Sequence, residues 1–182
     1  MELLEEDHAV HFRCKAKGVG GLRIDVLHSL RGVKGFDALW VRRTTATTPD
    51  GLVVDLVSLP DLVKAKKTQR DRDWPMIRRL IEASYFANRE NPSLDQLNFW
   101  LLEGRTPEIL VEASKDNDTL AQSLVASRPL LAFALRGDAT TLELQLGEEE
   151  RSEKASDREY WRPLKEELER LRLDAARKKR RD

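Results

Sequence analysis

The sequence has very little cysteine and no long apolar stretch. Its single cysteine, Cys14, cannot form a disulfide within the chain. No apolar run approaches the roughly 20 residues that a membrane-spanning helix needs. The opening stretch MELLEEDHAV is acidic, whereas a secretory signal begins with basic residues. We therefore exclude disulfide-stapled and membrane-spanning classes, and we expect a cytoplasmic protein that does not bind membranes.

The chain also lacks an excess of charge of either sign, because 32 Lys and Arg residues balance 32 Asp and Glu residues. Overall attraction to nucleic acid or to an anionic membrane is thereby excluded, and there is no signal for DNA binding. Charged residues nevertheless make up 35% of the chain, which indicates much exposed helix. A chain of 182 residues is long enough to bury a real core.

The N-terminal third has the alternating pattern of β-strands. The segments VHFRCKA and LRIDVL flank the turn GVGG and predict a hairpin. The stretch RGVKGFDALWVRRTTATTPDG is predicted to form a loop or short helix, and LVVDLV follows it as a third strand. We expect an α+β fold with a small, mainly antiparallel or mixed sheet of about three strands.

Beyond Ser58 the pattern becomes helical. Ser58 and Asp61 have capping-box spacing, and Asp73 is predicted to cap a second helix. Further helices are predicted at 94–102, 107–113 and 119–126 and across RPLLAFALRGD, while TTLELQL fits a helix or a strand. The last segment is an amphipathic helix with a basic end. We expect an α+β domain at 1–90 and an all-helical region at 91–182.

Lys66 raises the first functional question. It extends the apolar helix face of Leu62 and Val63, and Arg70 follows four residues later. Such cations either extend to solvent or project into a cleft that needs positive charge. Together with strand-borne Asp25 and Asp55 they would supply cations for a polyphosphate and carboxylates for a divalent metal, a combination that suits nucleotidyl transfer.

The run VVDLVSLPDLVKAKKTQRDRDWPMIRRLIE resembles the C-terminal half of the minimal nucleotidyltransferase fold of abortive-infection-type toxins and their uncharacterised relatives. In that family a strand leads into a helix that bears a lysine, followed by an arginine and by a basic-Asp pair that caps the next helix. The resemblance covers residues 8–86. It matches the lysine to Lys66, the arginine to Arg70 and the pair to Arg72 and Asp73, and it places Asp25 where the family keeps a strand-borne carboxylate.

The resemblance implies a site and a reaction. Asp25, Lys66 and Asp73 would be catalytic, Lys66, Arg70 and Arg72 would bind an NTP, and Asp25 would bind Mg²⁺. Lys66 and Arg70 would point toward Asp25, and Asp73 would orient Arg70 or Arg72. The acceptor would be RNA or protein, in a toxin-antitoxin or phage-defence context with a possible antitoxin partner.

The chain departs from the family at its start. The family's Gly-Gly or Gly-Ser turn and its later Asp-x-Asp pair have no counterpart here, and one carboxylate is a poor site for two Mg²⁺ ions. We therefore expect either a start assigned too late or a degenerate member that does not catalyse alone. The alternative is a non-catalytic binding or interaction module built on the same half-fold.

Other candidate residues carry weaker signals. His8, His11 and His28 do not have the spacing of a zinc site, and Cys14 has no positioned base. Trp74 is expected to lie in a helical core rather than to stack on a nucleobase.

Overall fold

The computed structural model describes residues 10–27, 30–33 and 35–179. The chain divides into a first unit, Met1–Ala65, and a second unit, Lys66–Asp182, and each is described by itself. The division comes earlier than the boundary that the sequence suggested at residue 90. His8 and His28 lie outside the described residues.

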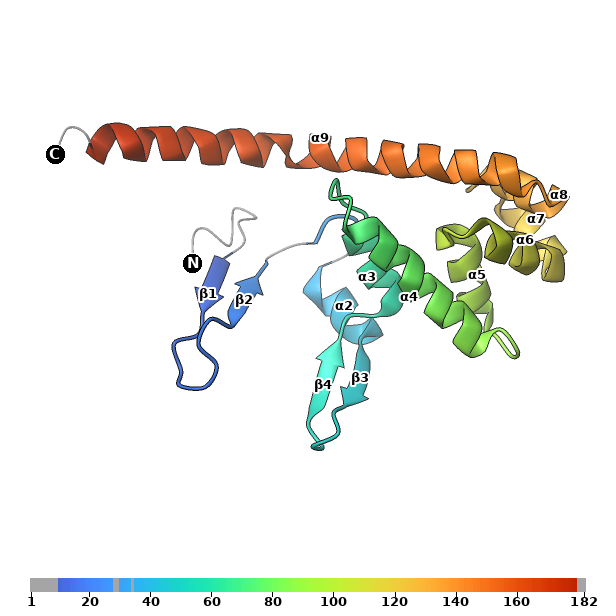
Figure 1. The fold of residues 1–182 in the computed structure, drawn as a ribbon, viewed down its shortest axis with the longest axis horizontal. Helices are drawn as coiled ribbons and strands as arrows, with labels where there is room; N and C mark the ends of the chain where they lie inside the picture. Colours follow the sequence, from blue (N-terminus) through green and yellow to red (C-terminus); the bar gives the residue numbers. More distant parts are fainter. Residues whose placement is uncertain (1–9, 28–29, 34, 180–182) are drawn as a thin grey trace. The chain divides into compact units, whose positions relative to one another are not determined.

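The first hairpin of the first unit pairs β1 (Val10–Arg13) with β2 (Arg23–Val26), antiparallel, as predicted (Figure 1). Gly18 and Gly21 have positive φ angles in the connection, which only glycine adopts without strain. His11 lies opposite Asp25 on one face, and Phe12 lies opposite Ile24 on the other. The apolar face is exposed, because Phe12 and Ile24 each retain about half of their accessible surface.

The third predicted strand pairs differently from our expectation. In the described residues, β4 (Val53–Leu56) forms a separate antiparallel hairpin with β3 (Thr44–Thr47), so the prediction of one three-stranded sheet is wrong. The partner strand TTAT belongs to the stretch predicted as loop or helix. Its threonines are β-branched and suit a strand. The turn at Asp50 and Gly51 is short, so pairing β4 with this neighbour loses less chain entropy than pairing it with a strand far away in the sequence.

Two helices complete the described part of the first unit, α2 (Phe36–Arg42) and α3 (Leu59–Lys66), of which the last residue, Lys66, already belongs to the second unit. Ser58 caps α3 as predicted, since its hydroxyl oxygen accepts from the Asp61 backbone N–H at 3.3 Å. The Asp61 carboxylate is buried and accepts two hydrogen bonds from Arg42, at 2.9 and 3.0 Å. This bidentate pair ties α2 to the start of α3.

The second unit is entirely helical in its described residues, which confirms the predicted switch from strands to helices. Its helices are α4 (Asp73–Asn88), α5 (Leu94–Glu103), α6 (Pro107–Asp116), α7 (Asp118–Leu124), α8 (Leu131–Arg136) and α9 (Ala139–Lys179). The ambiguous segment TTLELQL is helical. The second helix begins at Asp73 itself, with Arg72 at the N-cap and no side-chain cap, so Asp73 does not cap it as predicted.

The core of the second unit lies among these helices. Trp74, Ile77, Ile81 and Tyr85 recur at helical spacing on α4 and are all buried, as their periodicity predicted. The ring of Tyr85 meets Trp100 of α5 edge to face at 5.1 Å. The helices α6, α8 and α9 contact one another, and α9 contributes Leu142 and Leu146 to the core.

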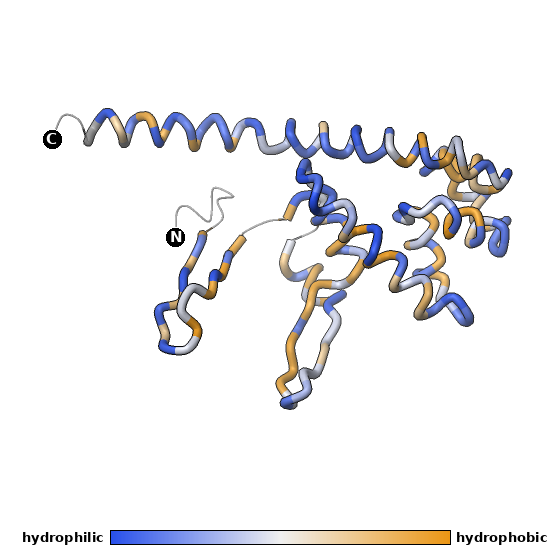
Figure 2. Tube along the Cα trace, in the orientation of Figure 1, coloured by the Kyte–Doolittle hydropathy of each residue, from blue (hydrophilic) through white to orange (hydrophobic). Residues whose placement is uncertain are grey.

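Helix α9 has 41 residues and continues past a proline, Pro163. Proline removes one intrahelical hydrogen bond and crowds the preceding turn, so this position is a natural place for the helix to bend. Figure 2 shows α9 as mostly hydrophilic with apolar residues recurring along it. No described helix combines the length and the apolar composition that crossing a bilayer requires.

Candidate functional site

Asp25, the predicted metal ligand, lies exposed on β2. Its Oδ1 accepts from Arg23 Nε at 2.6 Å and lies 2.7 Å from His11 Nδ1. The hydrogen bond from Arg23 lowers the pKa of Asp25 more than any other interaction. A carboxylate oxygen already shared by a guanidinium and an imidazole does not suit Mg²⁺, and the described residues contain no group of three or more His, Cys, Asp and Glu side chains that could hold a metal.

The other predicted site residues belong to the second unit. Lys66 ends α3 and is partly buried, whereas Arg70 and Arg72 are exposed in the loop before α4. Within the described residues, none of these three side chains has a hydrogen bond or an ion pair. The buried Asp73 carboxylate accepts from the Thr68 hydroxyl at 2.6 Å, so the expectation that it orients Arg70 or Arg72 is wrong. The approach of Lys66 and Arg70 to Asp25 stays a prediction.

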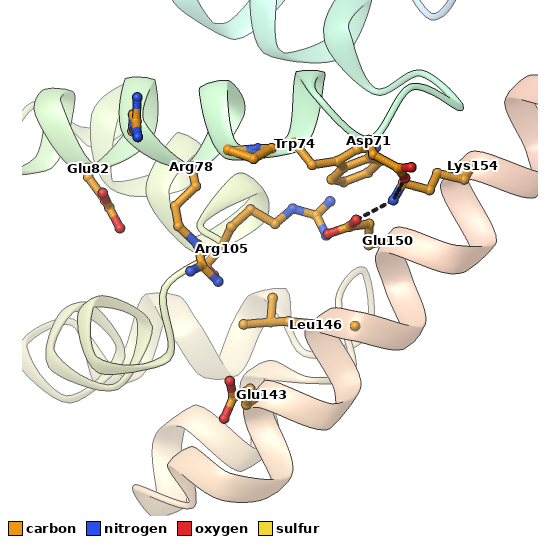
Figure 3. A pocket seen from close by; sticks show the side chains of 12 residues that line it. Asp71, Trp74, Arg78, Glu82, Arg105, Glu143, Leu146, Glu150 and Lys154 are labelled. Carbon is orange, nitrogen blue, oxygen red and sulfur yellow. Dashed lines mark hydrogen bonds and ion pairs between the residues drawn. The ribbon is translucent and has the colours of Figure 1, made fainter.

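The second unit has a cleft of about 680 Å³ (Figure 3). It is bordered by Asp71 and α4, by Arg105 in the link between α5 and α6, and by α9. Its volume falls in the range typical of small-molecule sites. Four cations line it: Arg78, Arg79, Arg105 and Lys154. Four carboxylates line it too: Asp71, Glu82, Glu143 and Glu150. The cleft is therefore balanced in formal charge, and its chemistry depends on which of these groups are already paired.

Most of the carboxylates are engaged. Lys154 Nζ donates to Asp71 Oδ1 at 2.7 Å and to Glu150 Oε1 at 2.6 Å, and Glu82 accepts from the Thr106 hydroxyl. These bonds raise the pKa of Lys154, and the bond from Lys154 lowers the pKa of Asp71. Glu143 is the exception, since it has no such partner among the described residues. Lys154 is thus shared by two acids at the rim, and this group of three keeps one net negative charge.

Trp74 forms part of the cleft wall between two cations. The Arg105 guanidinium carbon lies 4.9 Å from the centre of its ring and Lys154 Nζ lies 5.7 Å from it, close enough for cation-π attraction. The indole N–H donates to the Thr68 backbone oxygen at 2.9 Å. With only 4% of its surface exposed, Trp74 is a core residue as predicted and offers no face to a nucleobase.

Arg128 does not line the cleft, and each nitrogen of its guanidinium donates a hydrogen bond within the fold. Its guanidinium donates to the backbone oxygens of Leu101 and Gly104, each at 2.8 Å, at the C-terminal end of α5. It also donates to both oxygens of Glu149, at 3.0 and 2.8 Å. Arg128 therefore satisfies carbonyls that the helix leaves unpaired and fixes Glu149 in place.

Arg105 shares the same carboxylate but is poorly satisfied. Its side chain is 6% exposed, and its Nη1 lies 3.2 Å from Glu149 Oε2. Its Nε and Nη1 are buried without a hydrogen-bond partner among the described residues. Figure 3 shows its guanidinium beneath the Trp74 ring, and its backbone oxygen accepts from Arg78 at 3.1 Å. An unsatisfied buried donor lowers the stability of the fold by about 1–3 kcal/mol. A further acceptor near Arg105 would therefore be stabilising.

The pKa shifts agree with this unequal sharing. Burial lowers the pKa of Arg105, and the charge of Arg128 lowers it further. Burial alone would raise the pKa of Glu149, but the hydrogen bond and charge of Arg128, together with the charge of Arg105, bring it below its usual range. Glu149 is thus the one carboxylate among the described residues that both arginines contact, while the charges of Glu103 and Glu153 act on Arg105 from farther away.

Sequence reasoning missed this cluster entirely. Arg105, Arg128 and Glu149 come from three segments far apart in the chain, and no short motif marks any of them. The only local signal is that Arg105 follows Gly104 at the end of a predicted helix.

Comparison with protein-family models, with curated proteins and with solved structures found no match. The function therefore has to be argued from the chain's own residues.

Proposed function

We propose that the second unit is a non-catalytic binding module that holds a small anionic ligand, with phosphate or carboxylate oxygens, in the cleft beside Arg105. One observation carries the proposal: a buried guanidinium on the cleft wall makes no hydrogen bond to any described residue through Nε or Nη1, and Nη1 meets Glu149 only as an ion pair at 3.2 Å. An anionic oxygen that reached these two nitrogens would accept their hydrogen bonds. The Arg105 side chain has to turn toward the cleft to reach it, because both nitrogens are buried.

The residues that line the cleft would have different roles in binding the anion. Arg79 is exposed, has no hydrogen bond or ion pair within the described residues, and is the cation best placed to meet a ligand first. The negative charge of Glu143, which also lines the cleft, would repel an anionic ligand. A nucleoside triphosphate is the member of this ligand class that the nucleotidyltransferase resemblance implies, and its phosphates rather than its base would be recognised, since Trp74 is buried.

Binding of ATP, measured by calorimetry without magnesium and compared with inorganic phosphate and citrate, tests this proposal. We expect Arg105→Ala and Arg79→Ala each to weaken binding, by about 10-fold for Arg105, in line with the loss of a charge-assisted hydrogen bond. Glu143→Gln should tighten it. Lys66→Ala and Arg70→Ala are matched controls outside the cleft, and we expect little effect from either. Equal affinity of wild type and Arg79→Ala, or a loss seen only in the two controls, would overturn the assignment.

Nucleotidyl transfer rests on the family resemblance alone. Without further carboxylates the protein lacks ligands for the metal ions that stabilise a phosphoryl transition state. We therefore expect no transfer from labelled NTPs to RNA in the presence of magnesium. Labelling that disappears in Asp25→Ala would favour the transferase instead.

A further inference from the structure

The last part of α9 has an apolar stripe with a seven-residue repeat. Trp161, Leu164, Leu168 and Leu171 follow one another at intervals of three, four and three residues. This is the a-d-a-d pattern of a coiled coil, with leucine at both d positions. Pro163 falls at a c position, away from the stripe, where it does not obstruct a facing helix.

This stripe continues beyond the body of the second unit. Asp157, one turn before Trp161, is buried and accepts from the Gln69 backbone N–H at 2.8 Å, and Lys165 donates to the Gln69 side chain at 3.2 Å. Past Lys165, no hydrogen bond or ion pair joins the described part of α9 to another element of its unit. Leu171 is 46% exposed, so the end of the stripe lacks a covering partner in its own unit.

The charged residues beside the stripe indicate which kind of helix can pack against it. In heptad terms, Lys165 and Arg172 take the two e positions, whereas Glu167 and Asp174 take the two g positions that follow Trp161. When two identical helices run parallel, a g residue meets the e residue five positions later on the other helix. Glu167 of each copy then faces Arg172 of the other. In an antiparallel pair, e would meet e and g would meet g, which sets like charges together.

We propose that this stripe, Trp161 to Leu171, docks against the same stripe of a second copy of the chain in a parallel, two-stranded coiled coil. A seam of two heptads is short, and helices of this length are marginal alone, so the dimer forms reversibly with concentration. The interface is self-complementary, as a two-fold dimer requires.

Sedimentation of the full chain over a wide range of concentration tests the proposal. We expect a monomer-dimer equilibrium in wild type and an increase of about 10-fold or more in the dissociation constant of Leu168→Glu. Leu173→Glu is the matched control, because Leu173 is 54% exposed and lies outside the stripe, and it should leave the equilibrium unchanged. Thermal unfolding of both variants checks that the fold is retained.

Charge reversal distinguishes a parallel seam from other arrangements. Glu167→Lys and Arg172→Glu should each weaken self-association, and the double variant should restore it, because each reversed residue meets its reversed partner across the dimer axis. A chain that stays monomeric at every concentration overturns the proposal. So does a double variant that fails to recover, or an equal effect of Leu173→Glu and Leu168→Glu. A monomer that loses stability on Leu168→Glu would show that the stripe is covered within one chain.

Discussion

At the scale of single residues, Glu149 is the carboxylate that two buried arginines contact. Its pKa lies below the usual range, so the folded state favours the charged form more than the unfolded state does. The stabilisation is therefore complete above the unfolded pKa, near 4.3, and is lost as the pH falls through the folded pKa.

We expect Glu149→Gln to lower the free energy of unfolding by about 2 kcal/mol at neutral pH, because it removes the charge from the carboxylate that Arg105 and Arg128 both contact. The difference from wild type should begin to shrink as the pH falls below the unfolded pKa, about 4.3, and should be lost as the pH falls through the lowered pKa of the folded carboxylate. Urea unfolding at a series of pH values measures this difference. Glu148→Gln is the control, since Glu148 is exposed and its one ion pair among the described residues is with Arg151 at the surface. A pH-independent difference for Glu149→Gln would contradict the argument.

At the scale of elements, the end of α5 depends on the absence of a side chain at Gly104. A Cβ there would lie 2.6 Å from the Trp100 backbone oxygen and 2.8 Å from Leu110 Cδ2. The backbone angles of Gly104 are open to any residue, so the constraint is one of space. Gly104 also offers its carbonyl oxygen to Arg128, and Arg105 follows directly, so this close approach helps position both arginines.

We expect Gly104→Ala to destabilise the fold by about 1–3 kcal/mol through overpacking. Gly147→Ala is the matched control, because Gly147 lies inside α9 and its added Cβ would meet only Arg151 Nη1, at 3.7 Å. That change should stabilise the helix by up to about 1 kcal/mol. Thermal and urea unfolding measure both. Similar stability changes in the two variants would show that the space around Gly104 is not the limiting factor.

The elements also show what sequence alone could predict. The helices that bury one regular face, above all α4, were predicted correctly. The spacing of their apolar residues along the sequence matches the face that each helix buries. The pairing of β4 with β3 was missed because several segments compete as its partner. The segment TTAT has a weaker strand pattern than VHFRCKA and LRIDVL, which were predicted as strands. The arginine cluster was missed for a related reason: three segments bring its members together, and a lone Arg in a sequence does not reveal whether its donors are satisfied.

At the scale of the whole molecule, the two units differ in how much apolar surface they bury. The second unit has a core of large aliphatic and aromatic side chains, whereas the hairpins of the first unit leave Phe12, Ile24 and Val53 exposed. Two-stranded hairpins are marginally stable unless something packs against them.

We therefore expect amide hydrogen exchange to be fast in β1 to β4 and slow in α4, α5 and α6. Mass spectrometry of exchange in the native protein measures this order. Gly104→Ala should speed exchange in the second unit and leave the hairpins unchanged. Equal protection of both units would show that the hairpins pack in solution.

The position of Trp74 between two cations has an optical consequence. The emission energy of an indole depends on the charges beside its ring, and here those charges belong to Arg105 and Lys154 on the wall of the cleft. An anion that enters the cleft changes the electric field at that ring. Trp74 is one of four tryptophans, so a variant that keeps Trp74 alone would carry an unlabelled fluorescent reporter for the site, and this residue is only 4% exposed to a quencher in solution.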